Sequence, residues 1–104
     1  MPTTLSYSAA LVLQALDQGH RYGFQVMQAT ALPSGTVYPV LRRLEAAGLL
    51  ASAWEDEGVA HESGRPARRY YTLSREGRVS LEAAGERIRT QAQLFALPGD
   101  AGQA

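Results

Sequence analysis

The apolar spacing between residues 34 and 47 constrains this fold most. Val37, Leu41 and Leu44 recur at positions i, i+4 and i+7, which places them on one face of a helix. Gly48 follows, and glycine suits the left-handed cap that ends many helices. The sequence therefore predicts a helix over 34–47 that packs one side against a core.

Two more helices are predicted ahead of this one. Apolar residues at helical spacing indicate a helix over 5–16, with Gly19 as its stop. A short helix over 24–28 follows, and it ends before Pro33, which disfavours helical geometry in the residue that precedes it. A very short turn joins the second and third helices, so the pattern predicts a helix-turn-helix.

The start of the 34–47 helix is unusual because it holds a glycine and a proline. We expect Ser34 to cap the helix with its hydroxyl, and Gly35 to let this end approach a phosphate closely. Pro39 removes one backbone hydrogen bond in the second turn, so a bend or a looser first turn is expected.

A β-hairpin with a long tip is predicted next. Residues 49–55 and 67–74 alternate along their length and bracket a polar stretch that contains Gly64. Because this connecting loop is longer than the roughly two to five residues of most hairpin loops, we expect its tip to be mobile. Trp54 and Tyr71 alternate as core-facing strand residues do.

The last predicted element is a helix over 74–97. Ser74 stands where a cap belongs, and Glu76 lies in the first turn, where the helix dipole favours negative charge. The small, turn-prone residues at 98–104 have nothing to pack, so a disordered tail is expected.

The order helix, helix, helix, hairpin, helix is that of a winged helix-turn-helix. The predicted fold class is mainly α with a small β-hairpin: a winged helix-turn-helix at 1–73 followed by one C-terminal dimerisation helix. In such proteins the third helix, here 34–47, enters the major groove of DNA, and the hairpin, here 49–73, is the wing that reaches the backbone.

The apolar stripe leaves the polar residues of the 34–47 helix free to contact DNA. Arginine can fork onto guanine or phosphate, and hydroxyl groups can bond phosphate. Two alternatives stay open, since Tyr38 could pack against the wing and Arg43 could pair with Glu45. Together with the arginines at the wing base, the predicted DNA contacts are Ser34, Gly35, Thr36, Tyr38, Arg42, Arg43, Arg65, Arg68 and Arg69.

Acidic residues on the hairpin oppose this prediction. Glu55, Asp56, Glu57 and Glu62 share the wing with the arginines, and DNA would repel them. They either form a solvated face turned away from DNA or weaken binding. The formal net charge is zero, so a winged helix that contacts only protein is the alternative function.

The final helix is predicted to pair with a second copy of the chain. Its apolar residues fall on a seam of roughly seven-residue period, which water would otherwise contact. Two copies about a twofold axis would bind half-sites about 34 Å apart, so a palindromic operator is expected. The predicted dimer contacts are Leu5, Leu81, Ala84, Ile88 and Phe95.

Composition excludes several classes of protein. The chain has 104 residues, enough for one modest domain, and no cysteine, so disulfides and thiolate sites are absent. Nucleophile and phosphate-loop motifs are missing, so no enzyme activity, cofactor or metal is expected. The apolar N-terminal stretch is shorter than the roughly 20 residues of a membrane span, and we expect a cytoplasmic protein without a membrane partner.

Three motifs resemble one known family. "YGFQVM", "PSGTVYPVLRRLEAAGLLAS" and "GRPARRYYTLSREGR" are similar to the pattern of the PadR-like transcriptional regulators over about residues 5–81. The resemblance implies a homodimeric bacterial repressor that leaves its operator when a small molecule or another signal acts.

The sequence departs from the family pattern in three ways. The link between the first two motifs is shorter than usual, serine and proline are exchanged before Gly35, and the chain has a single helix after the wing. Some short members bind flat aromatic drugs between tryptophans at the dimer centre. The last helix here has no tryptophan, so that pocket is not expected.

Overall fold

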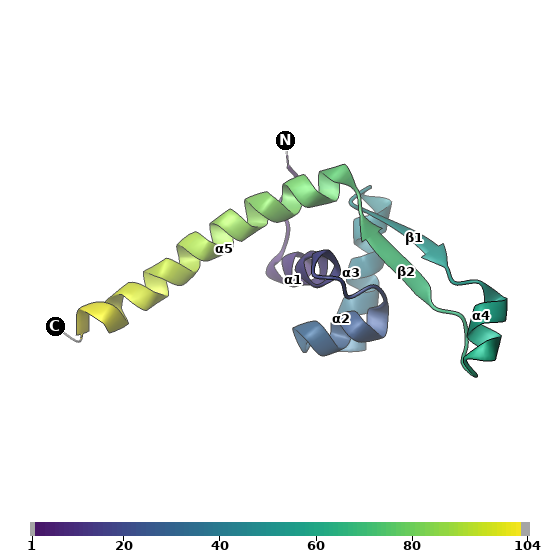
Figure 1. The fold of residues 1–104 in the computed structure, drawn as a ribbon. Helices are drawn as coiled ribbons and strands as arrows, with labels where there is room; N and C mark the ends of the chain where they lie inside the picture. Colours follow the sequence, from purple (N-terminus) through teal and green to yellow (C-terminus); the bar gives the residue numbers. More distant parts are fainter. Residues whose placement is uncertain (1, 103–104) are drawn as a thin grey trace.

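Three helices build the N-terminal part of the fold. The computed structural model describes the backbone of residues 2–102 and the side chains of residues 2–96. In it α1 (Tyr7–Asp17), α2 (Gly23–Thr30) and α3 (Ser34–Ala46) follow one another, and both α2 and α3 pack on α1 (Figure 1). The predicted helix-turn-helix is therefore present, with α2 extended at both ends.

The end of α3 has the geometry predicted for it. Gly48 adopts φ +79°, and the amide of Leu49 donates to the carbonyl of Leu44 at 2.9 Å. The amide of Gly48 donates to the carbonyl of Glu45 at 3.0 Å. These two bonds are those of a Schellman cap, which leads the chain directly into the wing.

The start of α3 differs from the prediction. Pro33 is the N-cap, no side chain caps the helix, and Ser34 is the first helical residue. Because proline needs no amide partner and has fixed φ, it can precede the helix without the hydroxyl cap expected from Ser34. The helix continues through Pro39.

The wing is a two-stranded hairpin whose tip is helical. Strand β1 (Leu50–Trp54) pairs antiparallel with β2 (Arg69–Leu73), and the helix α4 (Glu57–Glu62) stands between them. The connection expected to be a loop thus contains a helix. Asp56 caps α4 by accepting the amide of Gly58 at 2.7 Å, and Gly64 at φ +71° ends it.

Trp54 does not face the core. Its exposed fraction is 66%, whereas Tyr71, on the partner strand, is buried as predicted. The hairpin extends beyond the three-helix core, so only its base, at Leu50, Tyr71 and Leu73, is covered (Figure 1). Alternation predicts which face of a strand a side chain is on. Whether that face is buried depends on how far the core extends along the strand.

The core lies between α1, α3, the wing base and the first half of the last helix. Its largest fully buried apolar side chains are those of Val12, Leu13, Val26, Val37, Leu41 and Leu49. Leu5, Leu81 and Ala84 belong to the same cluster. They were expected to be dimer contacts, but α1 and the N-terminal segment cover them within one chain.

Helix α5 (Arg75–Gly102) begins as predicted. The Ser74 hydroxyl oxygen accepts the amide of Gly77 at 3.0 Å and donates to the carbonyl of Gly48 at 2.7 Å. A side chain at position 77 would collide with the carbonyl oxygen of Leu49, so glycine lets α5 start against the end of α3.

The second half of α5 extends away from the domain, on the side opposite α4 (Figure 1). Ile88 is half-buried, whereas residues 89–96 are exposed. The helix continues to Gly102, so residues 98–102 are helical where a disordered tail was expected. Residues 103–104 of that tail lie outside the described residues.

No described helix is both long enough and apolar enough to cross a membrane.

Candidate nucleic-acid interface

The exposed face of α3 carries one centrally placed arginine. Gly35, Pro39, Arg42 and Ala46 lie opposite the buried stripe, and Arg42 is the charged member of this set. Among the described side chains, none pairs with its guanidinium. Arg42 is therefore free to bind an anion or a base edge.

Arg43 lies on a different side of the helix. It lines a shallow groove formed with the N-terminal segment, at Thr3 and Thr4. Helical spacing places Thr36 on this side too, away from Tyr38. The suggested pairing of Arg43 with Glu45 does not form, because Glu45 bonds to the wing instead.

The N-terminus of α3 is open. The amides of Thr36 and Val37 both donate to the carbonyl of Pro33. The amides of Ser34 and Gly35 have no protein acceptor within the described residues, and a side chain at position 35 would meet open space. This end can therefore approach another molecule closely.

Tyr38 packs against α2 rather than against the wing. A Cβ at position 23 would lie 2.6 Å from the Tyr38 hydroxyl oxygen, so only glycine admits the ring there. The ring keeps 40% of its surface exposed. It can contact both the neighbouring helix and a bound partner.

Arg65 is held by an acid of its own wing. Its guanidinium binds both carboxylate oxygens of Glu55, one at 2.9 Å, and Glu55 also accepts from the Tyr70 hydroxyl at 3.1 Å and the Arg68 amide at 3.2 Å. The bond from Arg65 is the largest cause that lowers the pKa of Glu55 to about 2, and the same bond raises the pKa of Arg65. Glu55 is thus a structural acid at the end of the strands next to α4, not the solvated residue that was expected.

Arg68 stacks on an aromatic ring of the helix-turn-helix. Its guanidinium carbon lies 4.2 Å from the centroid of Tyr22, the residue that precedes α2. The amide of Tyr71 donates to the carbonyl of Arg21 at 2.9 Å, so β2 is also bonded to this turn. These contacts attach one side of the wing to the start of α2.

Arg69 attaches the other side of the wing to α3. Its Nε donates to the Ser52 hydroxyl at 2.9 Å, and its Nη2 lies 3.4 Å from the Glu45 carboxylate. The guanidinium also lies 5.5 Å from the Trp54 ring centroid. Burial raises the pKa of Tyr71.

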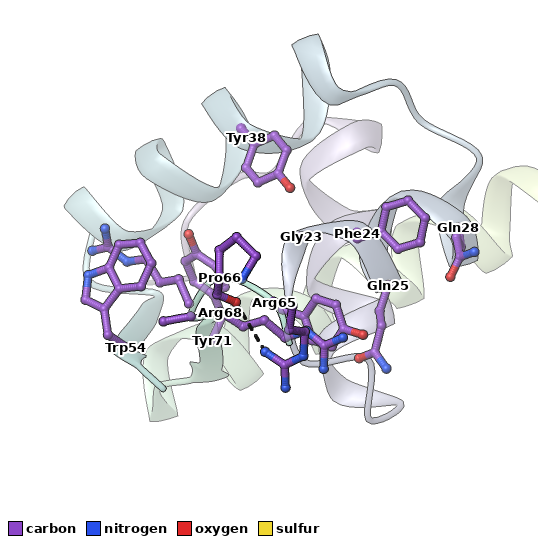
Figure 2. Close-up of a pocket in the computed structure, with 13 residues that line it drawn as sticks. Gly23, Phe24, Gln25, Gln28, Tyr38, Trp54, Arg65, Pro66, Arg68 and Tyr71 are labelled. Atoms are coloured by element: carbon purple, nitrogen blue, oxygen red, sulfur yellow. Dashed lines mark hydrogen bonds between the residues drawn. The ribbon is translucent and has the colours of Figure 1, made fainter. Parts of the chain in front are cut away.

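A cleft of about 560 Å³ lies between the wing and the helix-turn-helix, where α2 and its preceding residue form most of the wall and α3 contributes Tyr38 (Figure 2). In the view of Figure 2, Tyr38 stands on one side, Arg65 and Arg68 on the other, and Trp54 and Phe24 at the two ends. No acidic side chain of the described residues lines it. An aromatic, cationic groove of this kind suits a nucleic-acid backbone. Its aromatic and amide lining, at Tyr22, Phe24, Gln25, Gln28 and Trp54, was not among the predicted contacts.

Most of the wing's acids are placed away from this cleft. Asp56, Glu57 and Glu62 belong to α4 and its cap, at the far end of the hairpin (Figure 1). The acids and the arginines are only partly separated in space: Arg68 and Arg69 stand at the end of the strands, where they line the cleft, and Arg65 lines both the cleft and a pocket that it shares with Glu57.

This fold and the basic cleft define a winged helix-turn-helix protein of the DNA-binding class. The sequence model of the "Transcriptional regulator PadR-like family" matches residues 12–83. The chain belongs to the PadR-like family of transcriptional regulators, which are DNA-binding and non-enzymatic. Family membership thus favours DNA binding over the alternative of a module that contacts only protein.

Solved structures agree with this assignment. A PadR family regulator from Clostridium difficile R20291 is 27% identical, with a TM-score of 0.74 over 88% of this chain and 97% of that one. BpsR of Bordetella bronchiseptica, whose DNA binding is regulated by 6-hydroxynicotinic acid, is 26% identical, with a TM-score of 0.71 over 89% and 67%. The protein smu.1704 of Streptococcus mutans UA159 shares the fold at 22% identity, with a TM-score of 0.73 over 92% and 91%. A comparison with curated protein sequences found no match.

Proposed function

We propose that this chain is a repressor that binds a palindromic operator as a homodimer, with α3 in the major groove and the hairpin as the wing. One observation carries the proposal: Arg42 projects from the exposed face of α3, unpaired among the described side chains, and the same helix contributes Tyr38 to a cleft lined with arginines. In this proposal Arg42 reads a base edge, and Arg68 and the open end of α3 bind phosphates.

The second half of α5 supports the homodimer. Leu94 is 69% exposed and Phe95 is 85% exposed on the second half of α5, where residues 89–96 are not covered by any other described residue. A partner helix would remove these side chains from water. The proposed interface is therefore Ile88, Leu94 and Phe95, whereas Leu81 and Ala84 remain core residues.

Release by a small molecule is part of the proposal. It rests on BpsR, whose DNA binding responds to 6-hydroxynicotinic acid. A ligand that changed the angle between two α5 helices would move the two copies of α3 relative to the DNA. If the ligand bound more tightly to the arrangement that does not fit DNA, it would shift the population of the protein toward the DNA-free state.

Selection of DNA from a random-sequence library, followed by footprinting, tests this function. Two protected half-sites with inverted symmetry, centred about 34 Å apart, are expected. Protection of a single half-site at saturating protein would contradict the dimer and the palindrome. Reporter expression in a deletion strain distinguishes repression, which raises expression on deletion, from activation, which lowers it.

A further inference from the structure

The orientation of the wing is not set by burial. Only the base of the hairpin is covered, at Leu50, Tyr71 and Leu73, and the rest of both strands is exposed or half-buried. Contacts with the segment before α2, which include the backbone bond from the Tyr71 amide to the Arg21 carbonyl, and side-chain contacts with α3 therefore decide where the arginines of the wing stand. On the α3 side, these contacts come from Glu45, Ser52 and Arg69.

These three side chains form one directional network. The Ser52 hydroxyl donates to Glu45 Oε2 at 2.6 Å and accepts from Arg69 Nε at 2.9 Å. Arg69 Nη2 stands 3.4 Å from both carboxylate oxygens of Glu45. A hydroxyl has one proton to donate. Because the Ser52 hydroxyl accepts from Arg69, it donates that proton to Glu45, and the hydrogen bonds run in one direction from Arg69 through Ser52 to Glu45.

Glu45 stands in an unfavourable place for a DNA-binding surface. Helical spacing puts it on the same side of α3 as Tyr38 and Arg42. A carboxylate there repels the phosphates that this face is proposed to approach. Its presence calls for a role that outweighs this repulsion.

We propose that Glu45, Ser52 and Arg69 are positioning residues that hold the wing at a fixed angle to α3, and that Arg69 acts through this network and not on a phosphate. The inference rests on the proposed DNA-binding mode, and it removes Arg69 from the predicted DNA contacts. Arg65 is already committed to Glu55, so Arg68 is the wing arginine left to bind phosphate.

The solvent exposure of the Arg69–Glu45 ion pair allows a positioning role to be distinguished from a role in folding. The side chains of Arg69 and Glu45 are 42% and 32% exposed, and ion pairs with this much solvent contribute little to global stability. Variants of the network should therefore fold and unfold as the wild type does. Their effect should appear in DNA binding, where the angle between two contact surfaces matters.

The test measures DNA affinity as a function of salt for E45Q, R69Q and the double variant. The probe is a duplex that the wild-type protein selects from a random-sequence library. We expect E45Q and R69Q each to lower affinity about threefold or more, with the slope of log affinity against log salt unchanged. The double variant should bind no more weakly than either single variant, because both remove one network.

A direct phosphate contact gives the opposite result. E45Q would then raise affinity, because a negative charge leaves the DNA surface, and R69Q would reduce the salt slope by about 0.9. Either outcome overturns the inference. E57Q, which removes one exposed acid from α4, is the control for charge alone and should not lower affinity.

Failure of the inference is distinguishable from failure of the proposed function. If wild-type protein selects no duplex, the DNA-binding mode itself is wrong. If it selects one and E45Q binds that duplex as well as or better than wild type, only the positioning role is wrong. Urea unfolding of each variant identifies any loss of affinity that comes from misfolding. S52A removes the hydroxyl that links Glu45 to Arg69 without a change of charge, so it should lower DNA affinity as E45Q and R69Q do.

Discussion

Tyr38 lies across Gly23, so closely that a Cβ at position 23 would be 2.6 Å from the Tyr38 hydroxyl oxygen. One residue begins α2 and the other stands on the exposed side of α3. The contact therefore joins the two helices of the helix-turn-helix at the edge of the cleft (Figure 2).

Gly23→Ala should displace the Tyr38 ring. We expect the free energy of unfolding to fall by about 1 kcal/mol and DNA affinity to fall as well, because the hydroxyl leaves its place at the cleft. In a Tyr38→Ala background the same substitution should cost almost nothing, since the obstructing ring is absent. A double-mutant cycle by urea unfolding measures this coupling, and equal costs in both backgrounds would contradict it.

Leu81→Ala and Phe95→Ser should have different effects, because Leu81 is a core residue and Phe95 belongs to the proposed dimer interface. Leu81 is buried within one chain, so its truncation should lower the free energy of unfolding by about 2–5 kcal/mol. Phe95 is exposed, so Phe95→Ser should leave the fold intact and raise the dimer dissociation constant. Analytical ultracentrifugation with thermal unfolding checks both. Dimers of undiminished affinity in Phe95→Ser would place the interface elsewhere.

Acid should weaken the wing through Glu55. Its pKa is lowered from 4.5 to about 2, so the stabilisation is fully present above the unfolded value and is lost as pH falls through that window. Glu55→Gln should be less stable than wild type at neutral pH, and the two proteins should converge as pH approaches 2. Urea unfolding at a series of pH values measures the difference, and a gap that stays constant with pH would show that Glu55 is not the titrating group.

Arg42 and Arg68 should differ in what they contribute to DNA binding. Arg42→Ala should cost about 1–3 kcal/mol of discrimination between the selected duplex and a random one, because a base contact is lost. Arg68→Ala should weaken both duplexes alike and reduce the salt slope by about one. Competition binding with the two duplexes distinguishes them, and equal small effects at both positions would refute this division.

Local signals predicted much of the fold. The stripe at Val37, Leu41 and Leu44, the glycine stop at Gly48 and the cap at Ser74 each depend on neighbours within a few residues, and the structure bears out all three. The tip helix α4 had local signals too, since Asp56 and Gly64 are a cap and a stop. They were overlooked because the segment is short and polar.

Pairings across long sequence distances could not be predicted in this way. Arg69 finds Glu45 on α3, and Arg68 finds Tyr22 ahead of α2, only after the hairpin has folded back on the helices. The prediction that Trp54 faces the core is wrong for a related reason, since burial depends on where the core ends rather than on periodicity. The arginines were recognisable as a group, but their separate roles required the three-dimensional arrangement.

The most direct test of the central claim is the affinity of wild-type protein and Arg42→Ala for the selected duplex across a range of salt. We predict that wild-type affinity falls steeply, with a log–log slope of about −0.9 for each phosphate neutralised. We also predict that Arg42→Ala loses affinity for this duplex and keeps its affinity for a random one. Wild-type binding that is indifferent to salt, or an Arg42→Ala protein that distinguishes the two duplexes as well as the wild type does, would contradict a DNA-reading surface on α3.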